Sequence, residues 1–183
     1  MLIQGNKIGT NAEGTKAVGN QVHGLNMRGT GHLIGGTKTS ERNIISGNAN
    51  YGVHFTQSNI TLHGNHIGTN TQGTKAIPNG WAGVSVAANV VIGGTAPGQG
   101  NLISGNSGQG IVTNGKVLIQ GNRIGTQVNG LTPLPNQLSG ISINRPGDAV
   151  IGGDSPEATN IIAFNGENGI RIELNSNPKN NAF

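Results

Sequence analysis

The acidic residues are the first place to look for catalytic chemistry, because the chain carries only seven of them. General acid–base cleavage of a glycosidic bond needs two carboxyl groups held about 5–9 Å apart. One local group of acids exists, and we keep it as a candidate acidic cluster: Asp148, Asp154 and Glu157. A solvated Asp that shapes a turn beside glycine is the simpler interpretation, so no catalytic residue is assigned.

The five histidines are the next candidates for chemistry, because the chain has no cysteine and hence neither disulfides nor zinc–thiolate sites. A metal site needs two or three converging ligands. His54 and His66 fall on different short apolar segments and need not share a face, whereas His63 and His66 flank a Gly-Asn corner. We expect surface histidines without a metal, and no cofactor.

The charge balance limits the possible partners. The net charge is +4, from 11 Lys/Arg against 7 Asp/Glu, which allows a weak attraction to acidic polymers. The basic residues are scattered and aromatic residues are only 3% of the chain, so a nucleic-acid platform with clustered cations and stacking rings is not expected.

The composition excludes several fold classes. The chain holds 33 Gly, 26 Asn and 20 Ile but only 10 Leu, which disfavours a helical bundle. The glycines follow no three-residue period, which excludes collagen. No run of 18 apolar residues exists, so no membrane span is expected, and no signal peptide is visible because Met1 leads straight into a repeat motif.

Internal repeats cover the chain. GNKIGTNAEGTKA recurs as GNHIGTNTQGTKA and GNRIGTQVNGLTP, starting at Gly5, Gly64 and Gly121. IGGTKTSERNIISGN recurs as IGGTAPGQGNLISGN and IGGDSPEATNIIAFN, starting at Ile34, Ile92 and Ile151. A Gly-apolar-x-apolar motif gives a unit of about 29 residues, since it begins at Gly24, Gly52, Gly83, Gly110, Gly140 and Gly169.

Each repeat unit contains three short alternating apolar segments bounded by Gly or Asn, which is typical of short strands. Three strands per period predict a chain that coils, with successive coils stacked about 4.8 Å apart. One inward column is expected to consist of Ile8, Ile45, Ile67, Ile103, Ile124 and Ile162. Asparagines recur at the corners and are expected to form a structural ladder of hydrogen-bonded amides, made of Asn6, Asn48, Asn65, Asn106 and Asn122.

These motifs resemble the tandem NxIGTNxxGT and IGGTxxGxxNxISGN repeats of large bacterial surface or secreted proteins, and the whole pattern is similar to proteins of pectin-lyase-like architecture. The resemblance implies an all-β, right-handed parallel β-helix of about six coils with three short strands each, in an extracellular or cell-surface protein. Enzymes of this group rely on clustered Asp and Glu, with Arg or Lys as base in the lyases. No position of this chain matches those motifs.

An outward column is the best candidate for a binding surface. The residue before the core Ile alternates between basic and aliphatic: Lys7, Ile44, His66, Leu102, Arg123 and Ile161. Its basic members, Lys7, His66 and Arg123, are the candidate contacts for an acidic polysaccharide. The alternative is that the apolar members lie beneath insert loops while long cationic side chains extend around them.

We expect residues 1–183 to form a single β-helix domain, a segment of a longer repeat array, with a polar tail over residues 175–183. Open solenoid ends expose backbone groups and core, so self-association through the ends is expected. The favoured function is a non-catalytic scaffold or spacer, or a weak polysaccharide-contact surface. The alternative is a polysaccharide lyase or hydrolase, or an inactive fragment of one.

Overall fold

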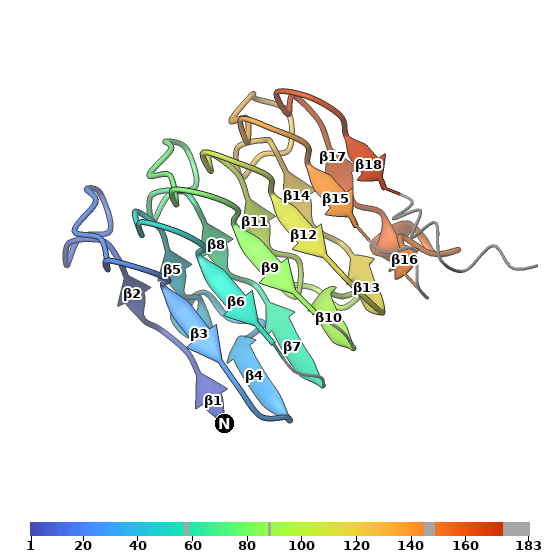
Figure 1. The fold of residues 1–183 in the computed structure, drawn as a ribbon, viewed down its shortest axis with the longest axis horizontal. Helices are drawn as coiled ribbons and strands as arrows, with labels where there is room; N and C mark the ends of the chain where they lie inside the picture. Colours follow the sequence, from blue (N-terminus) through green and yellow to red (C-terminus); the bar gives the residue numbers. More distant parts are fainter. Residues whose placement is uncertain (57–58, 88, 145–148, 174–183) are drawn as a thin grey trace, which may run out of the picture.

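The computed structural model describes residues 1–56, 59–87, 89–144 and 149–173, which form a parallel β-solenoid (Figure 1). Within these residues, three consecutive strands make one coil, and six coils stack along one axis. The predicted all-β fold of about six coils with three strands each is confirmed. The predicted polar tail lies outside the described residues.

Three parallel six-stranded sheets form the walls of the solenoid. The first sheet contains β1 (Leu2–Ile3), β4 (His32–Gly35), β7 (Ile60–His63), β10 (Val90–Gly93), β13 (Val117–Gln120) and β16 (Ala149–Ile151). The second contains β2 (Lys7–Ile8), β5 (Ile44–Ile45), β8 (His66–Ile67), β11 (Leu102–Ile103), β14 (Arg123–Ile124) and β17 (Ile161–Ile162). The third contains β3 (Leu25–Met27), β6 (Val53–Phe55), β9 (Val84–Val86), β12 (Ile111–Thr113), β15 (Ile141–Ile143) and β18 (Ile170–Ile172).

The core consists of columns of β-branched side chains that point into the solenoid. The predicted isoleucine column is confirmed, because the register of the second sheet pairs its six members in succession from Ile8 to Ile162. The four members inside the stack are fully buried, and the two in the end coils are half-buried. Stiff β-branched residues suit this position because each column repeats one side-chain shape at one spacing.

Two kinds of insert interrupt the coils. Coils 1, 3 and 5 carry hairpin inserts between the second and third sheets, at residues 9–20, 68–79 and 125–136. Coils 2, 4 and 6 carry turn inserts between the first and second sheets, at residues 36–41, 94–99 and 153–158. The first and last turn inserts contain the short helices η1 (Thr39–Glu41) and η2 (Pro156–Ala158).

The hairpin insert of coil 3 explains the repeated Asn-x-x-Gly-Thr motif. Its stem is closed by an antiparallel bridge between Thr69 and Ala76. The Asn70 side-chain oxygen accepts hydrogen bonds from the backbone N–H groups of Thr74 (2.8 Å) and Lys75 (3.0 Å). The insert is therefore held in shape by its own asparagine, as expected of an Asx-type turn.

Asparagine side chains hydrogen-bond from coil to coil at two corners. The ladder before the second sheet has Nδ2–Oδ1 distances of 2.9 to 3.1 Å and consists of Asn6, Asn43, Asn65, Asn101, Asn122 and Asn160. The ladder before the third sheet has distances of 2.8 to 3.0 Å and consists of Asn20, Asn48, Asn79, Asn106, Asn136 and Asn165. The five asparagines expected in one ladder are thus divided between two columns.

Ladder asparagines also satisfy backbone groups near the corners. Asn101, for example, accepts the backbone N–H of Asn65 (2.9 Å) and donates from Nδ2 to the carbonyl of Leu62 (2.7 Å). Buried backbone groups without a partner are costly, and a corner interrupts the sheet ladder that would otherwise satisfy them. The amide therefore replaces the missing backbone partners, which explains why Asn recurs here.

Gly68 shows why glycine stands next to the second ladder. Its φ is +88°, a region that side chains rarely adopt. A Cβ at this position would also collide with the Ser104 carbonyl and the Asn106 amide of the next coil. Gly9 and Gly125, the equivalent residues, have φ of +86° and +88°.

Replacing Asn106 by Ala removes the acceptor of Asn79 and the donor to Asn136 at a fully buried position. We expect the free energy of unfolding to fall by about 2–4 kcal/mol, because buried polar groups lose their partners. Urea unfolding measures this change. Asn114→Ala is the control, since Asn114 is exposed and we expect a loss below about 0.5 kcal/mol there. Equal losses in the two variants would contradict the stabilising role of the ladder.

Candidate functional site

The outer face of the second sheet carries the candidate binding column. The strand register stacks its six members in succession from Lys7 to Ile161. Lys7 is exposed and Arg123 is half-buried, whereas Ile44, His66 and Leu102 are each no more than 4% exposed. The column therefore does not present a uniform row of cations.

The tips of the hairpin inserts cover part of this column. A Cβ added to Gly73 would lie 2.6 Å from Leu102 Cδ2 and 3.0 Å from His66 Cε1, so the tip glycine packs directly on both side chains. The equivalent tip Gly130 lies in the same way beside Arg123. Aliphatic residues thus lie beneath the inserts while Lys7 extends into solvent, as the alternative interpretation of the column expected.

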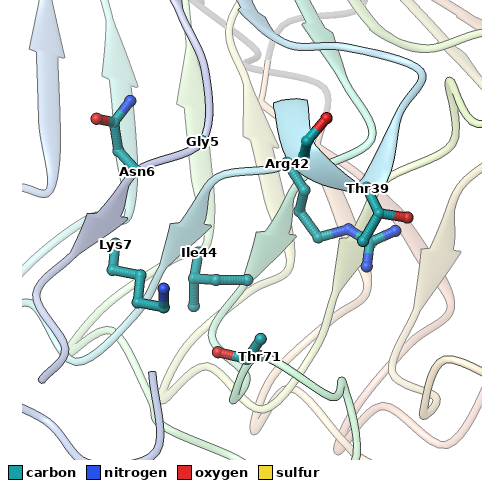
Figure 2. A pocket seen from close by; sticks show the side chains of 8 residues that line it. Gly5, Asn6, Lys7, Thr39, Arg42, Ile44 and Thr71 are labelled. Carbon is teal, nitrogen blue, oxygen red and sulfur yellow. The ribbon is translucent and has the colours of Figure 1, made fainter. Parts of the chain in front are cut away.

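A depression of about 260 Å³ lies at the N-terminal end of this face. Figure 2 shows the side chains of Lys7 and Arg42 on either side of Ile44, with the Thr71 hydroxyl at the edge. Two cations, hydroxyl groups and an amide therefore border one opening, lined by Gly5, Asn6, Lys7, Thr39, Ser40, Arg42, Ile44 and Thr71.

A second depression, of about 340 Å³, is bordered by Arg42, Arg123, Glu157 and the turn insert of coil 4. Because Arg42 borders both depressions, Lys7, Arg42 and Arg123 form a continuous band on the second-sheet face, which we name the cationic band. Burial lowers the pKa of Arg42, but a guanidinium stays charged at neutral pH. Its Nε donates to the Gly64 carbonyl (3.2 Å), which holds the side chain across the face.

Arg42 was not among the residues expected from the sequence, because it lies between the turn insert of coil 2 and β5 and not on a strand. It stands directly before the ladder residue Asn43, where coil 4 has Gly100. Aligning the coils on the ladder asparagines is the signal that would have identified it.

His66 does not have the properties expected of a polysaccharide contact. Its side chain is 3% exposed and lies beneath the hairpin insert of coil 3. Burial lowers the pKa of His66 to about 4, and the nearby Arg42 guanidinium acts in the same direction. At neutral pH the imidazole is therefore buried and uncharged, and Arg42 supplies the positive charge in this region.

Of the candidate acidic cluster, the structure describes Asp154 and Glu157. Asp148 lies outside the described residues. Asp154 and Glu157 are both exposed on the turn insert of coil 6. Glu157 borders the second depression, where its described neighbours are two arginines and no other carboxylate.

Neither a group of metal ligands nor a membrane-spanning helix is found among the described residues. Among the described residues, no three His, Asp or Glu side chains converge as potential metal ligands. No helix in the described part of the chain has the length and apolar character needed to cross a membrane.

An aromatic column on the corner before the third sheet was missed by the sequence analysis. Tyr51 stacks on His23 (ring centroids 5.2 Å apart), on His54 (5.1 Å) and on Trp81 (5.5 Å). Trp81 is 52% exposed, so this column brings aromatic surface to solvent. Its signal is visible when the coils are aligned on Gly24 and Gly52, because His23 and Tyr51 immediately precede these residues.

The depressed pKa of His66 predicts a pH-dependent stability. Between pH 6.5, the ordinary value, and about pH 4, the unfolded state binds more protons at this residue than the folded state. The free energy of unfolding therefore falls as the pH falls through this window, by up to about 3 kcal/mol from His66 alone.

His66→Leu removes this titration and places at residue 66 the side chain that Leu102 has in the next coil. Urea unfolding at pH 7 and pH 4 should show a smaller stability loss in the variant than in the unmodified chain. The other histidines with lowered pKa, His23, His54 and His63, are present in both proteins and cancel in the comparison. The same loss in both proteins would contradict the assignment.

Searches against protein-family models, curated proteins and solved structures found no match to this chain.

Proposed function

We propose that the chain is a non-catalytic β-helical scaffold module whose second-sheet face contacts an acidic polysaccharide. The observation that carries the proposal is the cationic band, in which Lys7, Arg42 and Arg123 border two adjoining depressions. The resemblance of the repeats to those of large bacterial surface or secreted proteins, and to pectin-lyase-like architecture, favours a surface or secreted parent protein.

The arrangement of the band suits a linear polymer that runs along the solenoid axis. Lys7 lies in coil 1 and Arg123 in coil 5, and four coil steps correspond to about 19 Å. Arg42 directly follows the turn insert of coil 2 and lies between them along the face. Successive carboxylates or sulfates of a chain can therefore reach separate cations without bending the polymer.

The neighbouring polar groups and aromatic rings support a sugar ligand. Thr39, Ser40 and Thr71 border the first depression and provide hydroxyl groups for hydrogen bonds to saccharide hydroxyls or anions. The exposed Trp81 offers an additional apolar surface to sugar rings at another corner of the solenoid. The openings are shallow and solvent-exposed, so we expect weak, salt-sensitive binding.

A polysaccharide lyase or hydrolase is the alternative. It needs a second acidic or basic group facing the first across the bound sugar, and the other charged residues that line the depression beside Glu157 are Arg42 and Arg123. Incubation with pectate, alginate and chondroitin-type polymers tests the alternative. New reducing ends or unsaturated uronate products would replace the scaffold proposal by an enzymatic one.

We also retain self-association through the solenoid ends as part of this proposal. Such association would lengthen the surface that each polymer chain can contact. Several weak contacts along one polymer would then combine into a stronger attachment.

Lys7→Gln/Arg123→Gln tests the polysaccharide contact. We expect its dissociation constant for polygalacturonate, measured by affinity electrophoresis at low salt, to rise roughly tenfold, because two charge contacts at the surface contribute about 0.5–1 kcal/mol each. Arg28→Gln/Lys116→Gln is the matched control. It removes one Lys and one Arg from exposed positions at the corner between the third and first sheets. If both double variants weakened polygalacturonate binding equally, or if neither did, the assignment of the cationic band as the contact surface would be wrong.

A further inference from the structure

Both asparagine ladders have the same direction along the solenoid. Every Nδ2 in a ladder donates to the Oδ1 of the next coil toward the C-terminus, as Asn6 does to Asn43 and Asn136 does to Asn165. At coil 1, the ladder acceptors of Asn6 and Asn20 therefore receive no ladder hydrogen bond among the described residues. The two ends of the solenoid are chemically different and complementary.

At coil 6 the ladders end on donors. Asn160 Nδ2 donates to the Ile119 carbonyl (2.7 Å), and Asn165 Nδ2 donates to carbonyls of Ile124 (3.2 Å) and Ala163 (3.3 Å). Neither donates to a further asparagine of a described residue. An acceptor row at coil 1 and a donor row at coil 6 match each other, whereas two identical ends do not.

The alternation of hairpin and turn inserts would also continue without interruption if coil 1 followed coil 6. Hairpin inserts occupy coils 1, 3 and 5, and turn inserts occupy coils 2, 4 and 6. A coil placed after coil 6 must therefore be of the hairpin type to continue the alternation, and coil 1 is of that type. Stacking coil 1 on coil 6 keeps both rows of inserts in order.

The hairpin inserts provide a further pair of complementary groups. Thr71 N–H donates to the Gly14 carbonyl (3.0 Å), and Val128 N–H donates to the Gly73 carbonyl (3.0 Å), so inserts two coils apart are linked. The next bond in this series would join the Ala12 N–H of one chain to the Gly130 carbonyl of another. Ala12 is exposed and its N–H has no backbone partner among the described residues.

The last coil exposes side chains that belong to the core columns. Ile170 and Ile172 align with Ile141 and Ile143 of coil 5, which are 0% and 4% exposed. In coil 6, however, Ile170 is 44% and Ile172 is 60% exposed.

We propose that copies of this chain associate head to tail, with coil 1 of one copy stacked on coil 6 of another. Both ladders, the three parallel sheets and the row of hairpin inserts then continue across the junction. Such a contact uses different surfaces on the two partners, so it leaves one free end of each kind and allows further copies to add. The proposal gives a geometry to the self-association proposed above and does not depend on the cationic band.

Two end-blocked variants test the proposal. Ile3→Asp places a charge at the coil 1 end, where Ile3 is half-buried, and Ile172→Asp places one on the exposed coil 6 end. Light scattering should show that the mass of the unmodified chain rises with concentration, while each variant alone stays monomeric. A one-to-one mixture of the variants should form dimers and nothing larger, because each variant retains one functional end.

Two further variants control for unfolding and for nonspecific effects of an added charge. Val112→Asp places the same charge on the outer third-sheet face of coil 4 and should associate like the unmodified chain. Ala12→Pro removes one junction donor at a turn position that accepts proline, where Gly14 N–H bonds the Asn11 carbonyl. It should weaken association several-fold while circular dichroism and thermal unfolding stay unchanged.

The outcomes that overturn the proposal are distinct from those that overturn the polysaccharide contact. A monomeric unmodified chain at every concentration, or dimers of either end-blocked variant alone, would overturn head-to-tail association. All masses are measured without polysaccharide. Lys7→Gln/Arg123→Gln should associate as the unmodified chain does, since these side chains lie on the outer face of the second sheet.

Discussion

The hydrogen-bond demand of buried corners is the constraint on which the solenoid depends. Strands of two to four residues satisfy the backbone hydrogen bonds of neighbouring strands through sheet ladders. A coil must turn between its strands, however, and the turns leave buried backbone groups without a partner in a sheet. The asparagine amides supply donors and acceptors at these points, and glycines such as Gly68 give the chain the left-handed backbone that brings it against the next coil. With the corners satisfied, isoleucine and valine can fill the interior of a chain that has no cysteine.

The repeat pattern predicts the fold well because the same physics acts in every coil. The spacing of the Ile8 column and the recurrence of Gly-Asn were sufficient to place six coils and three sheets. The ladder was predicted less completely, because Asn43 and Asn101 belong to the IGGT motif whereas Asn6, Asn65 and Asn122 belong to the GNxIGT motif, and only the folded coils stack the two motifs in one column. Local periodicity identifies positions that recur in sequence, whereas columns also contain residues that recur only in space.

The surface was predicted less well, since exposure depends on how inserts fold over neighbouring coils. His66 and Lys7 occupy equivalent positions, yet the Gly73 tip buries the first and Lys7 remains in solvent. Arg42 reaches the same face from the segment that directly follows a turn insert, and the aromatic column unites residues from several coils. A function for such a protein depends on the residues that the architecture leaves free, and the cationic band is a set of such residues on the second-sheet face.

The common direction of the ladder amides has an electrical consequence. Each amide carries a dipole, and the two columns align these dipoles along one axis inside a low-dielectric interior. Aligned hydrogen-bonded dipoles polarise one another, so an amide in the middle of a column interacts more strongly with its neighbours than one at its end. The solenoid thereby acquires a cooperative axial polarity, whereas the peptide dipoles of its strands alternate in direction from residue to residue and contribute little along the axis.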